Sequence, residues 1–298
     1  MRVTNSMMIN TFLTNLGKNA TRLSKYQNQM QTGKKFSRPS DDPVAASYAV
    51  QFDTDIAKET QYLVNVEAAE EMLTATETAL TSYNNVLGRV HELTVQASST
   101  TMSASAREAI TNELEQLREE LISVANTTYN GRYLFSGYQT DEKLISDDGT
   151  YLIDVQDNEV INYQIGQANR MQVNVLGTEA FGPATEGGKP LAFRTIDNLI
   201  TATKANNTDD IKGMLDEVSN LQDIVLKSVT DIGGRMNRLD LARSRITNNT
   251  NNLDEMRSLN EDVDIAEATT NFSMEKIVYQ SALAAGAQII QPTLLDFI

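Results

Sequence analysis

Cysteine and tryptophan are absent from this chain of 298 residues, and histidine occurs once, at position 91. Without cysteine, the chain can form no disulfide, thiolate metal site or thiol nucleophile. A Ser-His-Asp triad would depend on His91 alone. His91 and the Glu92 that follows it resemble neither a zinc helix of the HExxH type nor a Glu-x-x-His iron pair. We therefore predict a protein that is not an enzyme and has no metal site and no cofactor.

Long apolar runs are also lacking. The most apolar stretch, residues 282–290, contains Gly286 and Gln288 and is shorter than the roughly 18 residues that span a bilayer. Residues 1–16 carry one charge, at Arg2, and polar residues where a secretory signal has its apolar segment. The sequence therefore predicts no membrane partner and no cleaved signal peptide.

Positive charge is in deficit, with 25 Lys and Arg against 40 Asp and Glu and a net charge of −15. An acidic surface repels phosphates, so nucleic acid is not an expected partner. The imbalance is uneven, because residues 1–40 contain seven basic and no acidic residues, whereas residues 260–298 contain six acidic residues and one lysine. Opposite charge favours placing the two ends side by side. A solvated tail and an organellar transit peptide are the alternatives for the basic end.

An apolar residue recurs at alternating three- and four-residue spacing near the N-terminus, which is typical of a coiled-coil seam. The seam consists of Ile9, Phe12, Leu16, Asn19, Leu23, Tyr26 and Met30. Asn19 is its only polar member and either fixes register and partner number or faces solvent. Gly33 is expected to end this helix.

A loop is predicted over residues 37–43, where Pro39, Asp41, Asp42 and Pro43 form a structural turn. Proline suits the first turn of a helix, and either aspartate can act as the N-cap that accepts the free backbone N–H groups. From this cap a very long helix is predicted to run to about residue 97, because apolar residues occupy 12 of its 16 heptad positions. A third helix follows over about residues 106–125.

The C-terminal half repeats this organisation. Heptad register persists from Ile211 to Val263, which predicts a left-handed supercoil with partner helices. Gly233 and Gly234 interrupt it, so a kink or a close helix approach is expected there. The last helix, about residues 265–291, is apolar around much of its circumference and needs several neighbours, which further copies of the chain can supply.

Between the two helical halves, the apolar period changes to two residues. Alternation over residues 151–155, 160–164 and 171–175 predicts strands, and Asp-Asp-Gly at 147–149 predicts a turn. The predicted fold class is mainly α, an elongated antiparallel coiled-coil helical bundle with discontinuous N- and C-terminal segments and a small inserted β domain. Three domains are expected: residues 1–40 with 262–298, residues 41–140 with 190–261, and the β insert, residues 141–189.

Four segments give the sequence a family resemblance: residues 1–26, the Arg-Pro-Ser-Asp-Asp-Pro turn at 38–43, Asn-Gly-Arg-Tyr-Leu-Phe-Ser-Gly at 130–137, and residues 262–297. The chain resembles the flagellin superfamily of bacterial flagellar axial proteins. Within it, the turn and the Tyr-Leu-Phe-Ser-Gly segment look more like hook-associated proteins, which join hook to filament, than like flagellin. The β insert carries little of the resemblance.

The resemblance implies a structural role in motility. It implies a self-assembling ring or helical subunit whose terminal helices order on assembly, and whose partners are a neighbouring hook-associated protein, flagellin and a flagellar export chaperone. It also implies type III export to an extracellular place in the flagellum. The predicted assembly interface comprises Ile9, Phe12, Leu16, Asn19, Leu23, Tyr26, Phe272, Tyr279, Leu283, Ile290 and Leu294. A flagellin itself, or a coiled-coil scaffold unrelated to motility, are the alternatives.

Overall fold

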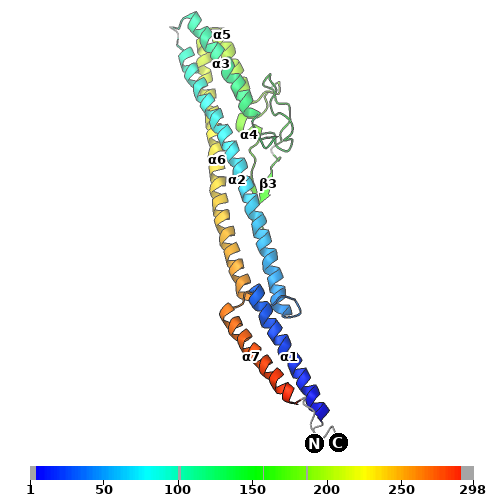
Figure 1. Ribbon diagram of the computed structural model, residues 1–298. Helices are drawn as coiled ribbons and strands as arrows, with labels where there is room; N and C mark the ends of the chain where they lie inside the picture. Colours follow the sequence, from blue (N-terminus) through cyan, green and yellow to red (C-terminus); the bar gives the residue numbers. More distant parts are fainter. Residues whose placement is uncertain (1–4, 100–101, 157, 186, 290–298) are drawn as a thin grey trace, which may run out of the picture. The chain divides into compact units, whose positions relative to one another are not determined.

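The computed structural model describes residues 5–99, 102–156, 158–185 and 187–289. Most of them lie in helices, and two antiparallel strand pairs complete the fold (Figure 1). The prediction of a mainly α protein with a small β region is confirmed. The elements are α1 (Asn5–Thr32), α2 (Pro43–Ala97), α3 (Ala104–Ala125), β1 (Thr128–Tyr129), β2 (Arg132–Tyr133), β3 (Asn162–Gln164), β4 (Arg170–Gln172), α4 (Gly177–Phe181), α5 (Leu191–Lys204), α6 (Thr208–Glu261) and α7 (Ile265–Ile289).

The chain divides into two compact units. Unit 1 combines Met1–Lys58 with Asn248–Ile298, and unit 2 is Glu59–Thr247. The long helices α2 and α6 each contribute residues to both units. The three domains expected from the sequence have other boundaries, and that division stays a prediction.

Unit 1 pairs the two ends of the chain. Helices α1 and α7 lie side by side (Figure 1). They are antiparallel, since Arg22 of α1 bonds to Glu275, whereas Phe12, nearer the N-terminus, touches Gly286, nearer the C-terminus. Gly33 ends α1 as predicted, with a φ of 70° that a residue with a side chain adopts only under strain.

Unit 2 holds the main apolar core. The predicted heptad positions of α2 point into it, because Leu73, Leu80 and Leu87 are fully buried. The seam of α6 is also buried from its start to residue 246, through Ile211, Val218, Leu221, Val225, Ile232, Leu239, Ala242 and Ile246. At about 25 cal/mol per Å² of apolar surface, such stripes provide the main driving force for packing these helices.

The β region is smaller than the sequence predicted. In the described part of residues 141–189, strands form only at Asn162–Gln164 and Arg170–Gln172, paired antiparallel with Tyr163 opposite Met171. Residues 151–155 form no extended strand, although Tyr151 makes an isolated bridge with Ile145. The alternation of apolar residues there reflects burial instead, since Ile153 and Val155 are both in the core. The rings of Phe135 and Phe181 make an edge-to-face contact, with 5.1 Å between their centroids, that stabilises the packing of this region.

The expectation of a close helix approach at the glycine pair of α6 is wrong for the described part of the chain. A Cβ atom built on Gly233 or Gly234 would have no neighbour within 4 Å, and α6 continues through both. The buried seam on either side of the pair stabilises the helix despite a propensity cost of about 1 kcal/mol for each glycine.

Candidate assembly interface

The seam predicted on α1 lies along one face of the helix. Ile9, Phe12, Leu16, Asn19, Leu23, Tyr26 and Met30 are each half-buried, while the residues between them are mostly exposed. Such a stripe arises because residues at three- and four-residue spacing fall on the same side of an α-helix. The seam is therefore covered on one side within a single chain.

The predicted α7 residues divide into two groups. Phe272 and Tyr279 are half-buried, whereas Leu283 keeps 46% of its surface exposed. The most buried positions of this helix are instead small residues, Ala268 and Gly286. Ile290 and Leu294 lie outside the described residues.

A ring-to-backbone contact brings α1 and α7 together near the chain ends. Gly286 is buried, and the ring of Phe12 occupies the place where a side chain at position 286 would begin. Only glycine leaves room for an aromatic ring so close to a helix backbone. The sequence places Gly286 on the apolar stripe of the last helix, but gives no signal that Phe12 lies opposite.

A polar chain crosses the same interface. Asn19 Oδ1 accepts a hydrogen bond from Arg22 Nη2 at 2.6 Å, and Arg22 Nε donates to Glu275 Oε1 at 2.9 Å. The other carboxylate oxygen, Oε2, is buried without a partner among the described groups. Asn19 thus orients the arginine that reaches α7. This role differs from the two expected from the sequence, which were to fix the coiled-coil register or to face solvent. The opposite charge of the two ends predicted pairing of this kind, but not these partners.

Main-chain bonds join the segment after α1 to the end of α6 and the link between α6 and α7. Val263 N donates to Gly33 O at 2.8 Å, and Lys35 N donates to Glu261 O at 2.6 Å. The Lys34 ammonium pairs with the Glu261 carboxylate. We call residues 33–35 and 261–263 the terminal clasp. The sequence missed this pairing, because two short extended segments without apolar alternation carry no strand signal.

The predicted turn has a defined hydrogen-bonding pattern. Asp42 caps α2, since its Oδ1 accepts from Val44 N at 3.1 Å and Ala45 N at 3.0 Å, and Pro43 begins the helix. Asp41 Oδ2 instead accepts from Arg38 N at 3.2 Å. Pro39 lies in the turn that closes when Asp41 N donates to Arg38 O at 3.0 Å.

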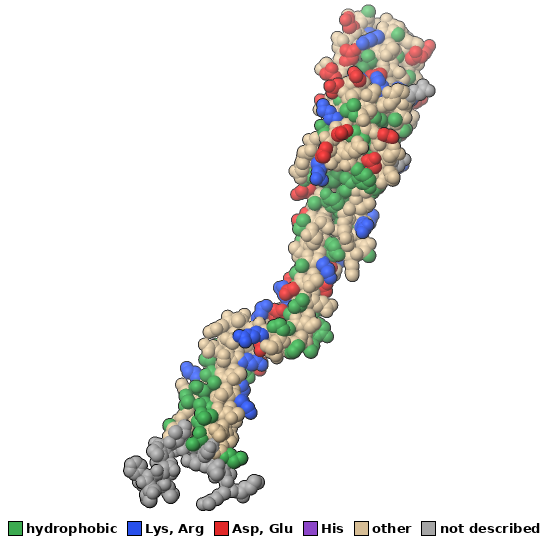
Figure 2. All heavy atoms as spheres, turned by 90° about the vertical axis from the view of Figure 1, so that its right-hand side faces the viewer, with side chains coloured by type: hydrophobic (Ala, Val, Ile, Leu, Met, Phe, Trp, Pro, Cys, Tyr) green, Lys and Arg blue, Asp and Glu red, His purple; other side chains and the backbone are tan. Residues whose placement is uncertain are grey.

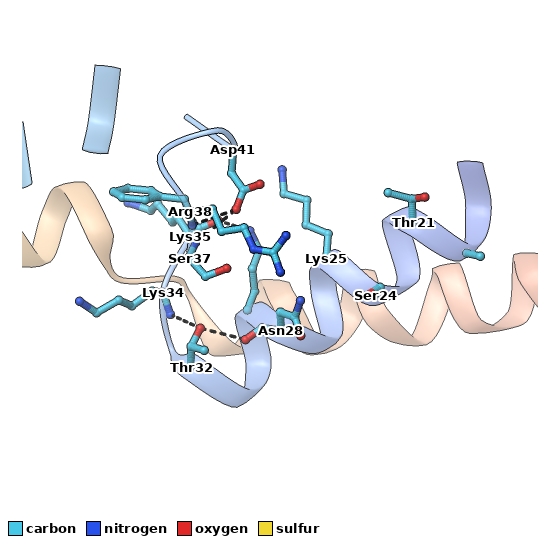
Figure 3. Close-up of a pocket in the computed structure, with 13 residues that line it drawn as sticks. Thr21, Ser24, Lys25, Asn28, Thr32, Lys34, Lys35, Ser37, Arg38 and Asp41 are labelled. Carbon is cyan, nitrogen blue, oxygen red and sulfur yellow. Dashed lines mark hydrogen bonds between the residues drawn. The ribbon is translucent and has the colours of Figure 1, made fainter. Parts of the chain in front are cut away.

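A basic groove of about 550 Å³ lies between the last turns of α1 and the loop that precedes α2 (Figure 3). Its cations are Lys25, Lys34, Lys35 and Arg38. Lys34 is paired with Glu261, and Lys35 Nζ donates to Leu259 O at 2.6 Å. Within the described structure, the side chains of Lys25 and Arg38 have no hydrogen-bond or ion-pair partner.

Apolar side chains remain exposed on both helices of the pair. On α1, Met7 and Leu13 are 62% and 52% exposed, and on α7 Met274 and Ile277 are 58% and 63% exposed. Large apolar residues at this density mark a surface for protein contact. The described pair therefore covers only part of its own apolar surface.

In unit 2, side chains rather than strands hold the segment after α3. The Asn126 amide bonds both main-chain groups of Ile145, donating to O at 2.8 Å and accepting from N at 3.1 Å. Tyr129 OH donates to Glu71 Oε2 at 2.7 Å, which raises the pKa of the phenol. These bonds fasten the segment after α3 to α2 and to the main chain at Ile145.

The described residues were searched for groups that could hold a metal ion. No group of three or more His, Asp or Glu side chains in the described ranges could hold a metal ion. Asp264 caps α7 by accepting from Ala266 N at 2.9 Å. No described helix has the length and apolar character needed to cross a membrane. What the fold does offer is paired helices with exposed apolar and basic surfaces, which defines the class of structural, interface-forming proteins.

Two family profiles give this class a name. The profile of the bacterial flagellin N-terminal helical region matches residues 3–140, and that of the bacterial flagellin C-terminal helical region matches residues 215–298. The chain belongs to the bacterial flagellin family.

Individual relatives are consistent with this placement. Flagellar hook-associated protein 3 of Escherichia coli K12 is 26% identical over 307 residues, which cover 99% of this chain and 94% of that protein. The crystal structure of Bacillus cereus FlgL has a TM-score of 0.60 at 22% identity and covers 70% of this chain and 99% of its own. That of the flagellar junction protein FlgL from Legionella pneumophila has a TM-score of 0.57 at 16% identity, covering 74% and 100%. Both structures show the same fold.

Proposed function

We propose that this chain is a structural subunit of the bacterial flagellum that acts at the junction between hook and filament. The observation that carries the proposal is the match over 99% of the chain to a flagellar hook-associated protein, together with a fold shared with a flagellar junction protein. It acts through interfaces and has no catalytic step.

Assembly is the source of its function in this proposal. The α1 and α7 faces that stay exposed in one chain become covered by further copies, in a ring or helical assembly. The predicted interface residues then divide their roles. Phe12, Phe272 and Tyr279 hold the pair together, and Leu283 faces a neighbour. Residues at the ends of the chain, Ile290 and Leu294 among them, belong to the same assembly surface.

The terminal helices order when the chain assembles. Ordering some 50 residues of α1 and α7 costs about 1–2 kcal/mol per residue, which contact with neighbours offsets. Limited proteolysis of the purified monomer tests this step. Cleavage within α1 and α7, with α2 to α6 of unit 2 protected, is expected, and protection of both terminal helices at low concentration would contradict it.

The partners follow from the junction role. One surface of the assembly contacts a neighbouring hook-associated protein and another contacts flagellin, and the chain reaches this extracellular position by type III export through the flagellum with the help of a flagellar chaperone.

Deletion of the gene in the motile host tests the junction role. Bare hooks with flagellin released into the medium, restored to filaments by the intact gene, are the expected result. Hooks without filaments and no flagellin in the medium would show that the chain is the filament subunit instead. Normal flagella would favour a scaffold unrelated to motility.

A further inference from the structure

The basic groove of unit 1 has more positive charge than its own chain neutralises. Figure 3 shows Lys25 and Arg38 directed into the space between α1 and the loop that carries Asp41. The Asp41 carboxylate is engaged by the main-chain N–H groups of Ser37 and Arg38, at 3.4 and 3.2 Å. Both cationic side chains are exposed. The groove is therefore suited to a partner that brings carboxylates.

A further lysine extends this positive charge along α1. Lys18 lies seven residues before Lys25, so both point from the same side of the helix, about 10.5 Å apart along its axis. Lys18 is exposed as well and, like Lys25, has no partner among the described groups. We call Lys18, Lys25 and Arg38 the basic row.

Unit 2 carries the complementary charge. Residues 59–247 contain 28 acidic and 15 basic residues, and acidic side chains are numerous over unit 2 on the face in Figure 2. On α6, Asp209, Asp216 and Asp223 follow one another at the same seven-residue spacing. All three are exposed, and among the described groups only Asp209 has an ion-pair neighbour, Lys212, at the weak distance of 4.0 Å. We call these three residues the acidic row.

We infer that the basic row of one copy binds the acidic row of a second copy. Equal spacing allows two charge pairs to form at once between helices, and the third cation, Arg38, extends the contact from the loop. A contact between two different surfaces leaves one of each free on every dimer, so it propagates into an open or ring-shaped assembly instead of stopping at a pair. This inference rests on the proposed function and identifies one of its interfaces.

Charge alone supports a second copy over other anions. Nucleic acid or anionic lipid would also attract the basic row, but both would be repelled by the acidic surface of unit 2. When the partner is a second copy, the acidic surface of its unit 2 instead attracts the basic row. The same arrangement steers association and selects the relative orientation of the copies.

The test uses charge exchange in the full chain, with self-association measured by analytical ultracentrifugation at low and high salt. The basic-row variant Lys25→Glu/Arg38→Glu and the acidic-row variant Asp216→Lys/Asp223→Lys should each weaken association on the order of tenfold. The variant that combines all four substitutions should recover most of it, because the substituted positions of the two rows then again carry opposite charges. High salt should weaken association of the unmodified chain.

The control variant Lys143→Glu/Arg170→Glu makes the same change in net charge as the basic-row variant, at exposed positions outside both rows and outside α1 and α7. It should leave association close to that of the unmodified chain. Equal weakening in the control, no recovery in the combined variant, or an unmodified chain that stays monomeric at low salt would overturn the inference.

The absence of cysteine allows a second measurement in assembled flagella. When one copy carries Arg38→Cys and another carries Asp216→Cys, oxidation should link the two kinds of copy, and a copy with Lys276→Cys should not link to Arg38→Cys. If the deletion strain regains filaments but no such link forms, the junction role stands and the charged-row contact is wrong.

Discussion

The ring of Phe12 lies against the backbone of α7 at Gly286, in the space that any larger residue at position 286 would need. Two helices from opposite ends of the chain approach closely at this point. A glycine on an otherwise apolar helix usually lowers its stability, so its presence here reflects the contact rather than the helix.

Replacement of Gly286 by alanine should therefore destabilise the helix pair. The new methyl group overlaps the Phe12 ring and forces it aside, at a cost of about 1–3 kcal/mol. Hydrogen exchange of α1 and α7 amides in the assembled protein measures this, with faster exchange expected in both helices. Gly17→Ala is the matched control, because Gly17 has open space around it and alanine there should slow exchange through better helix propensity. Equal effects of the two substitutions would contradict the packing argument.

The ion pair between Arg22 and Glu275 should respond asymmetrically to truncation. Glu275 keeps 18% of its side chain exposed and Arg22 keeps 52%. Arg22→Leu leaves a mostly buried carboxylate without a donor, at about 1–3 kcal/mol, whereas Glu275→Leu leaves an arginine that water can solvate, at about 1 kcal/mol or less. A double-mutant cycle followed by the same exchange measurement distinguishes the two. A smaller loss in Arg22→Leu than in Glu275→Leu would show that burial of Glu275 is not the controlling factor.

Asp42 should contribute to stability as the N-cap of α2. Asp42→Ala removes the acceptor for two main-chain N–H groups and should lower the free energy of unfolding by about 0.5–2 kcal/mol. Asp42→Asn retains an oxygen acceptor and should cost much less. Chemical denaturation followed by circular dichroism measures both. If asparagine proves as costly as alanine, the charge of Asp42 matters more than its hydrogen bonds.

The buried phenol of Tyr83 should make the core of unit 2 sensitive to alkali. Its hydroxyl is fully buried with no partner in the described structure, and burial raises its pKa far above the usual 10. The unfolded chain loses this proton at about pH 10 while the folded chain keeps it, so stability falls as pH rises above about 10. Tyr83→Phe removes both the unpaired hydroxyl and the loss of stability above pH 10 that its ionisation causes.

Thermal unfolding of the two proteins between neutral pH and pH 11 measures the effect. Tyr83→Phe should be at least as stable at neutral pH and should lose less stability above pH 10. Tyr138→Phe is the control, since Tyr138 is 60% exposed. Identical pH profiles for Tyr83→Phe and the unmodified chain would contradict this assignment.

The helical parts of the fold could be predicted from the sequence because their signal repeats. Leu73, Leu80 and Leu87 recur every seven residues, and each is buried. Alternation at Ile153 and Val155 was less informative, since burial in an irregular segment produces the same pattern as a strand. A periodic pattern specifies which face is covered but not by what type of structure.

The candidate site was predictable to a similar degree. The seam from Ile9 to Tyr26 is visible in the sequence, whereas the partners of Phe12 and Arg22 are not, because they lie more than 250 residues away and single contacts leave no periodic trace. The terminal clasp was missed because its two short segments have no periodic apolar pattern. Only the opposite charge of the two ends indicated that they meet.

The terminal clasp determines when unit 1 can form. Gly33 and Val263 are joined by a main-chain bond although more than 220 residues separate them, and the loss of chain entropy on closing such a loop comes before any gain from the contact. A chain that emerges from a narrow exit N-terminus first would therefore hold α1 without its mate until almost the last residue had passed. The two ends could then pair only after nearly the whole subunit had emerged.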